Sequence, residues 1–299
     1  MRVLVTGARG FVGSHTLQPL VEAGFEVHAL SRRVGDPAAH AVTWHQGDLL
    51  TPGFAAAFVR GLQPTHLLHL AWETTHPTYW TSPANVQWVE ASIALSRAFL
   101  EHGGTRIVAA GTCAEYDWRE GGVCDEETTP LRPATLYGVA KLQFAEALRT
   151  LCIEHHAGFA WARFFFVYGP GEQPERLLPS VTGALRRGEV ARCTSGQQRR
   201  DFIYVRDCAS ALVMLLLASA SGTFNVGTGS APSVRDVVTT IATVLDAADR
   251  VALGTLPERP DDPQLIVADI RRMQALGWSP AYDLRAGIEE TIRGSAGRG

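Results

Sequence analysis

Apolar and polar positions alternate along the first thirty residues in a way that predicts strand, turn, helix and strand. An apolar run at Val3 to Val5 is followed by three spaced glycines, an amphipathic stretch and a second apolar run from Glu26 to Leu30. Short apolar runs bounded by turn residues indicate buried strands, and the 3.6-residue periodicity between them indicates a helix.

The same alternation continues through the first half of the chain. Further strands are predicted at 41–45, 65–70, 106–110 and 159–166, and helices near 52–60, 84–102 and 133–156. Strands that alternate with helices form parallel sheets covered on both faces. The sequence therefore predicts an α/β fold with a doubly wound parallel sheet of the Rossmann type.

The pattern turns irregular after residue 168. We expect helices at 175–187, 206–220 and 233–247, short strands near 189–193, 202–205, 223–226 and 250–253, and two short closing helices. These pieces predict a smaller C-terminal α/β lobe. We place the main domain at 1–168, the second lobe at 169–293 and a flexible tail at 294–299.

The glycine turn after the first strand is typical of dinucleotide binding. Gly7 permits the tight turn, Gly10 lets the backbone approach a diphosphate, and Gly13 lets the helix pack closely on the sheet. The amino terminus of the helix then faces the phosphates. The spacing Gly-x-x-Gly-x-x-Gly differs from the common dehydrogenase fingerprint, and a purely structural turn is the alternative interpretation.

Three side chains are spaced as a set for proton transfer. Tyr137 and Lys141 are four residues apart on a predicted helix and share one face, and Thr112 precedes them at the end of a strand. A free phenol has a pKa of about 10, which a neighbouring ammonium lowers. We therefore expect Tyr137 to exchange protons near neutral pH in redox chemistry on a carbonyl or alcohol.

With TGARGFVG, the Thr112/Tyr137/Lys141 set, RRDF, GTFNVGTG and LGWSP, the chain resembles the extended short-chain dehydrogenase/reductase family, in its nucleotide-sugar epimerase, dehydratase and reductase group. The resemblance covers nearly the whole chain and implies that the second lobe binds substrate and is interleaved with the last elements of the main domain. It implies that Thr112, Tyr137 and Lys141 are catalytic. The cofactor contacts that it implies are Gly7, Arg9, Gly10, Phe11, Val12, Gly13, Ser31, Arg32, Arg33, Asp48, Leu49, Leu70, Ala71, Trp72, Tyr137 and Lys141.

Substrate contacts are carried over with one departure from the family pattern. They are expected at Thr112, Cys113, Phe166, Arg200 and Arg259, with the two arginines clamping a diphosphate. Phe166 stands where the family usually has an asparagine that contacts the sugar nucleotide. We interpret it either as a pocket wall against a deoxygenated sugar or as an ordinary core residue.

The aromatic segment 72–80 gives two open interpretations. It is expected to follow the fourth strand, where the resemblance places it above the nicotinamide. Trp72, His76 and Trp80 are equally well explained as substrate contacts or as local packing anchors.

The end of the second predicted strand bears on cofactor choice. Enzymes that use NAD usually carry a carboxylate there, whereas the 2′-phosphate of NADP(H) requires a cation. This chain has Ser31, Arg32 and Arg33 and no carboxylate. The sequence favours NADP(H) over NAD(H).

Composition narrows the partner to a small molecule. Charged residues make up 19% of the 299 residues and the net charge is −3, which favours neither nucleic acid nor an anionic membrane. The five cysteines lack zinc-type spacing, no histidine pair has metal-ligand spacing, and no signal peptide or membrane span is recognisable. We expect a cytoplasmic protein without a metal, and a homodimer on the resemblance.

These observations lead to a functional hypothesis with two alternatives. The main one is NADPH-dependent reduction of the C4 ketone of a nucleotide-diphosphate 4-keto-6-deoxyhexose, with a dTDP sugar expected. An NAD-dependent nucleotide-sugar 4-epimerase is the first alternative, and a non-catalytic NADPH-sensing protein is the second. Dehydration is disfavoured because Cys113 and Ala114 replace the acid and base of the dehydratases, and Glu115 is interpreted as structural.

Overall fold

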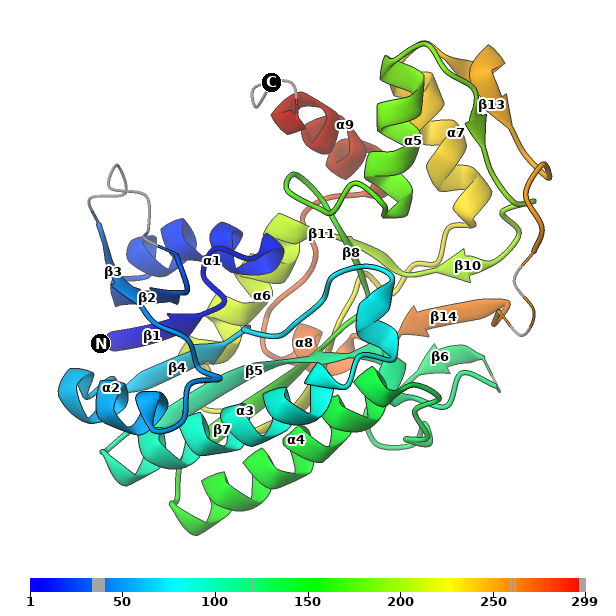
Figure 1. The fold of residues 1–299 in the computed structure, drawn as a ribbon. Helices are drawn as coiled ribbons and strands as arrows, with labels where there is room; N and C mark the ends of the chain where they lie inside the picture. Colours follow the sequence, from blue (N-terminus) through cyan, green and yellow to red (C-terminus); the bar gives the residue numbers. More distant parts are fainter. Residues whose placement is uncertain (34–40, 120, 259, 261, 296–299) are drawn as a thin grey trace.

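A seven-stranded parallel sheet forms the centre of the molecule in the computed structural model (Figure 1), which describes residues 1–33, 41–119, 121–258, 260 and 262–295. Its strands, in spatial order, are β12 (Gly222–Val226), β7 (Gly158–Phe164), β5 (Arg106–Thr112), β4 (His66–His69), β1 (Arg2–Thr6), β2 (Glu26–Ser31) and β3 (Val42–Gln46). Every pairing in this sheet is parallel. The predicted α/β class and Rossmann-type sheet are confirmed.

Helices cover both faces of this sheet, because its central strands have buried apolar residues on both faces. Helices α1 (Phe11–Glu22) and α6 (Val205–Leu217) pack together on one face, where Val3 and Val5 of β1 point. Helices α2 (Phe54–Leu62), α3 (Ala84–Glu101) and α4 (Leu136–Glu154) cover the other face, to which Leu4 contributes. Figure 1 shows these two layers on either side of the strands.

The second lobe lies beyond the carboxyl ends of the strands (Figure 1) and has an apolar core of its own. Its helices are α5 (Leu177–Arg186), α7 (Val234–Val244) and α9 (Leu284–Ser295), and its paired strands are β9 (Ala191–Arg192) with β13 (Val251–Ala252) and β8 (Phe166–Tyr168) with β11 (Phe202–Tyr204). The chain returns from this lobe to form α6 and β12. The predicted interleaving is therefore present, while the boundary at residue 168 stays a prediction.

Several element predictions were wrong in detail. The strand expected at 159–166 is two strands, because the backbone leaves β7 after Phe164 and β8 pairs with β11 instead. A three-stranded sheet of β10 (Arg199–Arg200), β14 (Leu265–Ala268) and β6 (Gly122–Cys124) was not foreseen, since strands of two to four residues give little periodicity and their partners lie far apart in sequence.

The closing segments differ from expectation as well. Of the two expected closing helices, α8 (Arg271–Ala275) is one turn and α9 is three. The predicted flexible tail begins too early, because Gly294 and Ser295 belong to α9. Residues 296–299 lie outside the described part of the chain. Among the described residues, no helix is both long and apolar enough to cross a bilayer.

Candidate active site

The glycine turn brings the backbones of β1, α1 and the end of β4 into close approach. Gly7 has φ +68°, and a Cβ added there would lie 2.7 Å from the backbone nitrogen of Ala71. A Cβ at Gly13 would lie 2.2 Å from the carbonyl oxygen of Gly7. Rigid backbone cannot yield to such contacts, so both positions require glycine.

Helix α1 presents an uncapped amino terminus to this turn. Gly10 is its N-cap residue, no side chain caps it, and its first turn contains no acidic residue. The first amides of a helix have no acceptor within the helix, and the helix dipole favours an anion there. Phe11, Val12 and Gly13 form this turn, and exposed Arg9 precedes it. These features fit the diphosphate of a dinucleotide.

The ends of β2 and β3 supply the other expected cofactor residues. Arg32 and Arg33 are exposed, and the backbone nitrogen of Arg33 donates to Ser31 Oγ at 3.2 Å. The carboxylate of Asp48 accepts the backbone N–H of Leu50 at 3.0 Å, and Leu49 is buried.

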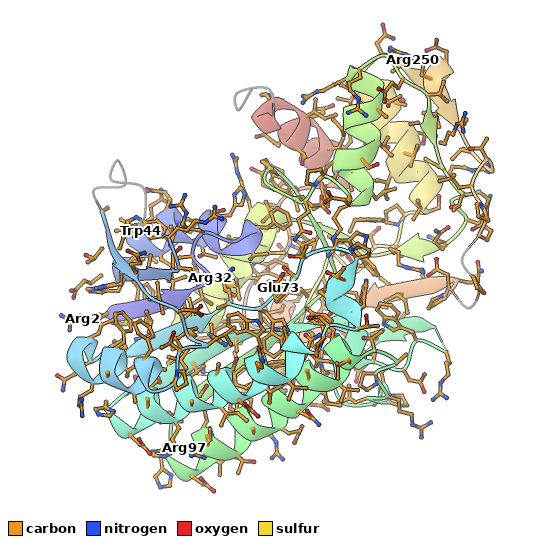
Figure 2. All side chains as sticks on the ribbon, in the orientation of Figure 1. Arg2, Arg32, Trp44, Glu73, Arg97 and Arg250 are labelled. Atoms are coloured by element: carbon orange, nitrogen blue, oxygen red, sulfur yellow. The ribbon has the colours of Figure 1, made fainter. Side chains whose placement is uncertain are left out.

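Arg32 also has an acidic neighbour that the sequence did not suggest. Hydrogen bonds from Thr75 are the main reason that the pKa of Glu73 is lowered, and the charge of Arg32 lowers it further. Arg32 and Glu73 lie near each other in Figure 2. The arginine expected to meet a 2′-phosphate is therefore near a carboxylate from the loop after β4.

The first turns of α4 carry Tyr137 and Lys141 to the end of β5, where Thr112 lies. Thr135 caps α4 by accepting the N–H of Gly138 at 3.2 Å. A Cβ at Gly138 would lie only 2.5 Å from the carbonyl oxygen of Ala114, so glycine after Tyr137 lets α4 approach the short helix η2 (Cys113–Glu115). The Thr112 side chain then lies near the phenol of Tyr137 and acts to lower its pKa.

The Tyr137 phenol is enclosed by aromatic rings from the loop after β4. The Tyr79 ring meets it edge-on at 4.9 Å and the Trp80 ring at 5.7 Å, measured between centroids. Burial raises the pKa of Tyr137 above its usual value, and the nearby Thr112 side chain offsets this only in part. This direction is opposite to the lowered pKa that the Tyr137–Lys141 spacing suggested.

Lys141 is the only lysine in the chain, and its side chain is buried. Its Nζ donates to the carbonyl oxygen of Ala110 at 2.9 Å and lies 3.8 Å from the ring centroid of Trp72. Burial lowers the pKa of Lys141 to about 7, and the charge of Glu115 opposes this shift. The ammonium is thus held in place, with only partial charge near neutral pH.

Glu115 is fully buried and makes structural contacts. Its carboxylate accepts the backbone N–H of Thr112 at 2.8 Å, the indole N–H of Trp161 at 3.0 Å and the guanidinium of Arg163 at 2.6 Å. These bonds fix the turn at the end of β5 and agree with the interpretation of Glu115 as structural.

Segment 72–80 is held by hydrogen bonds to two side chains, Asn85 and Gln173, that the sequence did not reveal. The amide of Asn85 accepts the indole N–H of Trp72 and donates to the backbone oxygen of Tyr79, both at 2.8 Å. Gln173, from the loop after β8, accepts the backbone N–H of His76 at 2.7 Å and donates to the carbonyl oxygen of Thr74 at 2.9 Å. The aromatic composition of the segment was the signal in the sequence, and the structure places the rings of Tyr79 and Trp80 against Tyr137.

The expected cofactor residues at the end of β4 lie against β1. The backbone nitrogen of Leu70 donates to the carbonyl oxygen of Thr6 at 3.2 Å, and that of Ala71 donates to Thr6 Oγ1 at 3.3 Å. The hydroxyl of Thr6 also bonds to buried His69, whose pKa is lowered to about 3 by burial. His69 is therefore neutral beneath the site.

The expected substrate residues are only partly gathered. The Phe166 ring lies 6.3 Å from that of Trp118, and the guanidinium of Arg200 lies 5.7 Å from the Phe166 ring. Arg200 is buried and forms an ion pair with Asp262. The resemblance had implied instead that its guanidinium binds the diphosphate of the substrate.

Two other expected substrate residues complete this account. Cys113 is buried, burial raises the pKa of its thiol, and its carbonyl oxygen accepts the indole N–H of Trp118 at 2.8 Å. Arg259 lies outside the described residues, so the expected clamp of two arginines stays a prediction.

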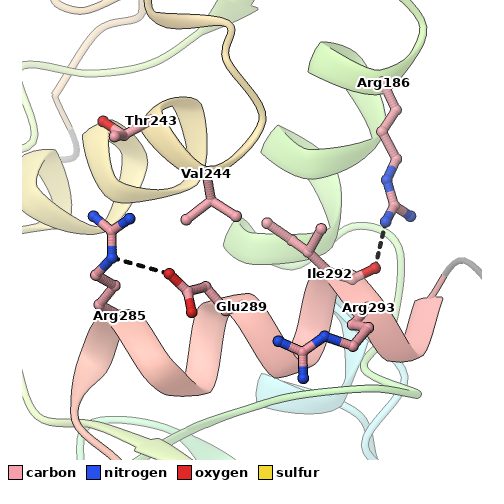
Figure 3. Close-up of a pocket in the computed structure, with 7 residues that line it drawn as sticks. All are labelled: Arg186, Thr243, Val244, Arg285, Glu289, Ile292 and Arg293. Carbon is pink, nitrogen blue, oxygen red and sulfur yellow. Dashed lines mark hydrogen bonds and ion pairs between the residues drawn. The ribbon is translucent and has the colours of Figure 1, made fainter.

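A surface hollow elsewhere contains none of the expected site residues. It lies between α5, α7 and α9 (Figure 3) and is lined by Arg186, Thr243, Val244, Arg285, Glu289, Ile292 and Arg293. Arg285 pairs with Glu289 across one turn of α9. Within the described part of the chain, no group of three or more histidine, cysteine or acidic side chains is arranged to hold a metal ion.

Comparisons with known proteins give the same picture of the fold. UDP-glucose 4-epimerase of Azospirillum brasilense is 30% identical over 96% of this chain and 89% of its own length. CDP-abequose synthase of Salmonella typhimurium strain LT2 is 26% identical over 97% of both chains. The structure of Thermus thermophilus UDP-glucose 4-epimerase in complex with NAD superposes with a TM-score of 0.88, at 26% identity over 100% of both chains.

The sequence model of the NAD dependent epimerase/dehydratase family matches residues 3–227, from β1 through β12. The matched segment includes the glycine turn and the Thr112, Tyr137 and Lys141 positions. It ends directly after β12, at the edge of the central sheet. The chain belongs to the NAD dependent epimerase/dehydratase family.

Proposed function

We propose that the protein is a nucleotide-sugar 4-epimerase, which oxidises and re-reduces C4 of a hexose linked to a nucleoside diphosphate. The observation that carries this proposal is the meeting of Thr112, Tyr137 and Lys141 at the carboxyl end of β5, in the same domain as the glycine turn. Relatives named UDP-glucose 4-epimerase match it over nearly their whole length. They support this alternative better than the reductase favoured by the sequence.

The described residues fit a nicotinamide dinucleotide. Gly7 and Gly13 let the backbones of β1, α1 and the end of β4 pack closely, and the uncapped first turn of α1 at this turn offers amides to a diphosphate. When bound, such a cofactor supplies a group that accepts and returns a hydride.

Residues of the chain itself donate a proton to the sugar oxygen and accept it back. Tyr137 carries its proton at neutral pH because burial raises its pKa, so it is ready to protonate an alkoxide. Thr112, whose side chain lies near the phenol, is placed to bind the same oxygen. Removing a proton from a hydroxyl requires Tyr137 to ionise, and positive charge on Lys141, one helical turn away, favours that form.

NADPH-dependent reduction of a 4-ketone is the second candidate, and the end of β2 favours it. Arg32 and Arg33 are exposed there, and β2 ends at Ser31 without a carboxylate. Charge-assisted bonds between guanidinium and phosphate favour NADP(H). CDP-abequose synthase is among the relatives that match over nearly the whole chain. A non-catalytic sensor is disfavoured because all three reactive side chains are retained.

The proposal includes two further properties, a reducing compartment and a homodimer. All five cysteines are free and buried, which agrees with a reducing compartment such as the cytoplasm. A homodimer is proposed through the outer faces of α3 and α4, where Val86, Leu136 and Ile153 are exposed.

Substrate assays separate the two candidate reactions. Purified protein is incubated with uridine-, thymidine-, cytidine- and guanosine-diphosphate hexoses, with and without added NAD, and the C4 epimers are separated by chromatography. In parallel, the 4-keto-6-deoxy sugars of the same nucleotides are supplied with NADPH, and its absorbance is followed. Epimer formation without net consumption of cofactor supports the epimerase. Stoichiometric NADPH consumption moves the assignment to the reductase, and no turnover in either assay contradicts both.

A further inference from the structure

Asn85, in the first turn of α3, is 1% exposed and uses its whole amide within the loop that covers the site. Its Oδ1 accepts the indole N–H of Trp72 at 2.8 Å. Its Nδ2 donates to the carbonyl oxygens of Tyr79 at 2.8 Å and Ser82 at 2.9 Å. An indole N–H only donates and carbonyls only accept, so these partners fix which end of the amide faces which neighbour.

Each end of this amide is bonded to an aromatic residue, through the indole N–H of Trp72 and the backbone carbonyl of Tyr79, and the ring of each residue touches one of the two reactive side chains. Trp72 lies over the Lys141 ammonium at 3.8 Å, and its ring also stacks on Trp88 at 6.2 Å. Tyr79 lies against the Tyr137 ring at 4.9 Å. One buried side chain is therefore linked to both groups, through two separate rings.

We propose that Asn85 is a positioning residue that holds Trp72 over Lys141 and Tyr79 against Tyr137. It touches neither of the two reactive side chains itself and acts only through the rings. The inference rests on the proposed roles of Tyr137 and Lys141. Its test observes Lys141 directly and requires no substrate, so that the inference and the proposed function can fail independently.

The chain contains a matched control for this test. Asn225, in β12, is fully buried, accepts the hydroxyl of Tyr116 at 2.8 Å and donates to the carbonyl oxygens of Cys124 at 2.7 Å and Asp269 at 3.2 Å. Its amide makes the same number and kind of hydrogen bonds as that of Asn85. Replacing either asparagine leaves similar buried groups without partners, so both changes carry a comparable structural cost.

Because Lys141 is the only lysine, protein labelled with isotopic lysine gives one side-chain NMR signal. The variants Asn85→Leu and Asn225→Leu are compared with the parent protein in a titration of this signal. In the parent, the ring of Trp72, 3.8 Å from Nζ, is expected to shift this signal upfield, and burial lowers the pKa of Lys141 to about 7. The charged and titratable groups around it are Glu115, Tyr137 and neutral His69, and neither variant changes them.

Asn85→Leu is expected to lose the upfield shift and to raise the pKa of Lys141 by about one unit or more, because a displaced Trp72 admits water to the ammonium. Asn225→Leu is expected to leave both unchanged. A parent-like signal and titration in Asn85→Leu would overturn the proposal, as would equal changes in the two variants. If a leucine variant does not fold, Asn85→Ser and Asn225→Ser provide the same comparison, since serine cannot span the same partners.

Discussion

At the residue scale, Tyr137 is the group on which the proposed chemistry depends most. Tyr137→Phe removes the phenolic proton and keeps the ring that packs against Tyr79 and Trp80. We expect turnover to fall by about 10² or more, with nearly unchanged affinity for the dinucleotide, because only the proton donor is lost. Steady-state kinetics and cofactor titration measure the two effects. Parent-like turnover in this variant would exclude Tyr137 as the acid.

The lowered pKa of Lys141 predicts how the free energy of unfolding depends on pH. Its pKa is about 7 in the folded protein, against 10.5 in an exposed lysine. Between these values the unfolded chain binds more protons than the folded one, so the Lys141 contribution to the free energy of unfolding rises with pH across this window. Below pH 7 the penalty for burying the ammonium is fully present.

The variant Lys141→Met isolates this contribution above pH 7, because burial keeps His69, whose pKa the Lys141 charge also lowers, neutral there in both proteins. Relative to the parent, the methionine variant should be more stable near pH 7 than near pH 9.5, as judged by urea unfolding at both values. The loss of the bond to Ala110 adds a constant offset at both pH values. A stability difference that is the same at both values would show that Lys141 is not desolvated.

At the element scale, the close approach of α1 to β1 explains the glycine turn. Gly13→Ala places a Cβ 2.2 Å from the carbonyl oxygen of Gly7. We expect the backbone to shift, with a stability loss of about 1 to 3 kcal/mol and weaker dinucleotide binding. Gly61→Ala is the control, because a Cβ in that part of α2 meets nothing within 4 Å and alanine favours helix. Thermal unfolding and fluorescence titration with NADH measure both variants; equal behaviour would contradict the packing argument.

The two arginines directly after β2 are expected to distinguish NADPH from NADH. Replacing Arg32 and Arg33 together with alanine removes charges that only a 2′-phosphate would use, so NADPH affinity should fall by about tenfold or more while NADH affinity changes little. Both titrations are made at one fixed ionic strength, because salt screens exposed pairs. Arg97→Ala, at an exposed position of α3, is the control. Equal losses for the two cofactors would favour NAD and strengthen the epimerase proposal.

At the scale of the whole molecule, the proposed dimer predicts different responses from two exposed apolar residues. Val86 on α3 is 50% exposed, and Leu217 at the end of α6, on the opposite face of the sheet, is 51% exposed. Val86→Glu should shift the protein toward monomer, because a carboxylate is costly to bury in an interface. Leu217→Glu should not. Light scattering after size-exclusion chromatography measures the mass, and unchanged mass in Val86→Glu would argue against an interface at α3.

The order of the main elements and the shared helix face of Tyr137 and Lys141 were predictable because their signals are local. Apolar runs and glycine spacing identify β1, α1 and β2, and the four-residue interval between Tyr137 and Lys141 places both on one helix face. Predictions failed where pairing joins distant residues, as in β14 beside β6, whose register sets Ile266 opposite Gly122. No local periodicity reports such a contact.

The sequence by itself determined the α/β class, the doubly wound sheet and the identity of the candidate reactive groups, because residue type and spacing settle these. Only the tertiary structure decided their chemical state. Burial beneath segment 72–80 raises the pKa of Tyr137 and lowers that of Lys141, and the ion pair with Asp262 occupies Arg200. Desolvation and pairing depend on what covers a side chain, and the residues that do so here, Trp72 and Asp262, come from other parts of the chain.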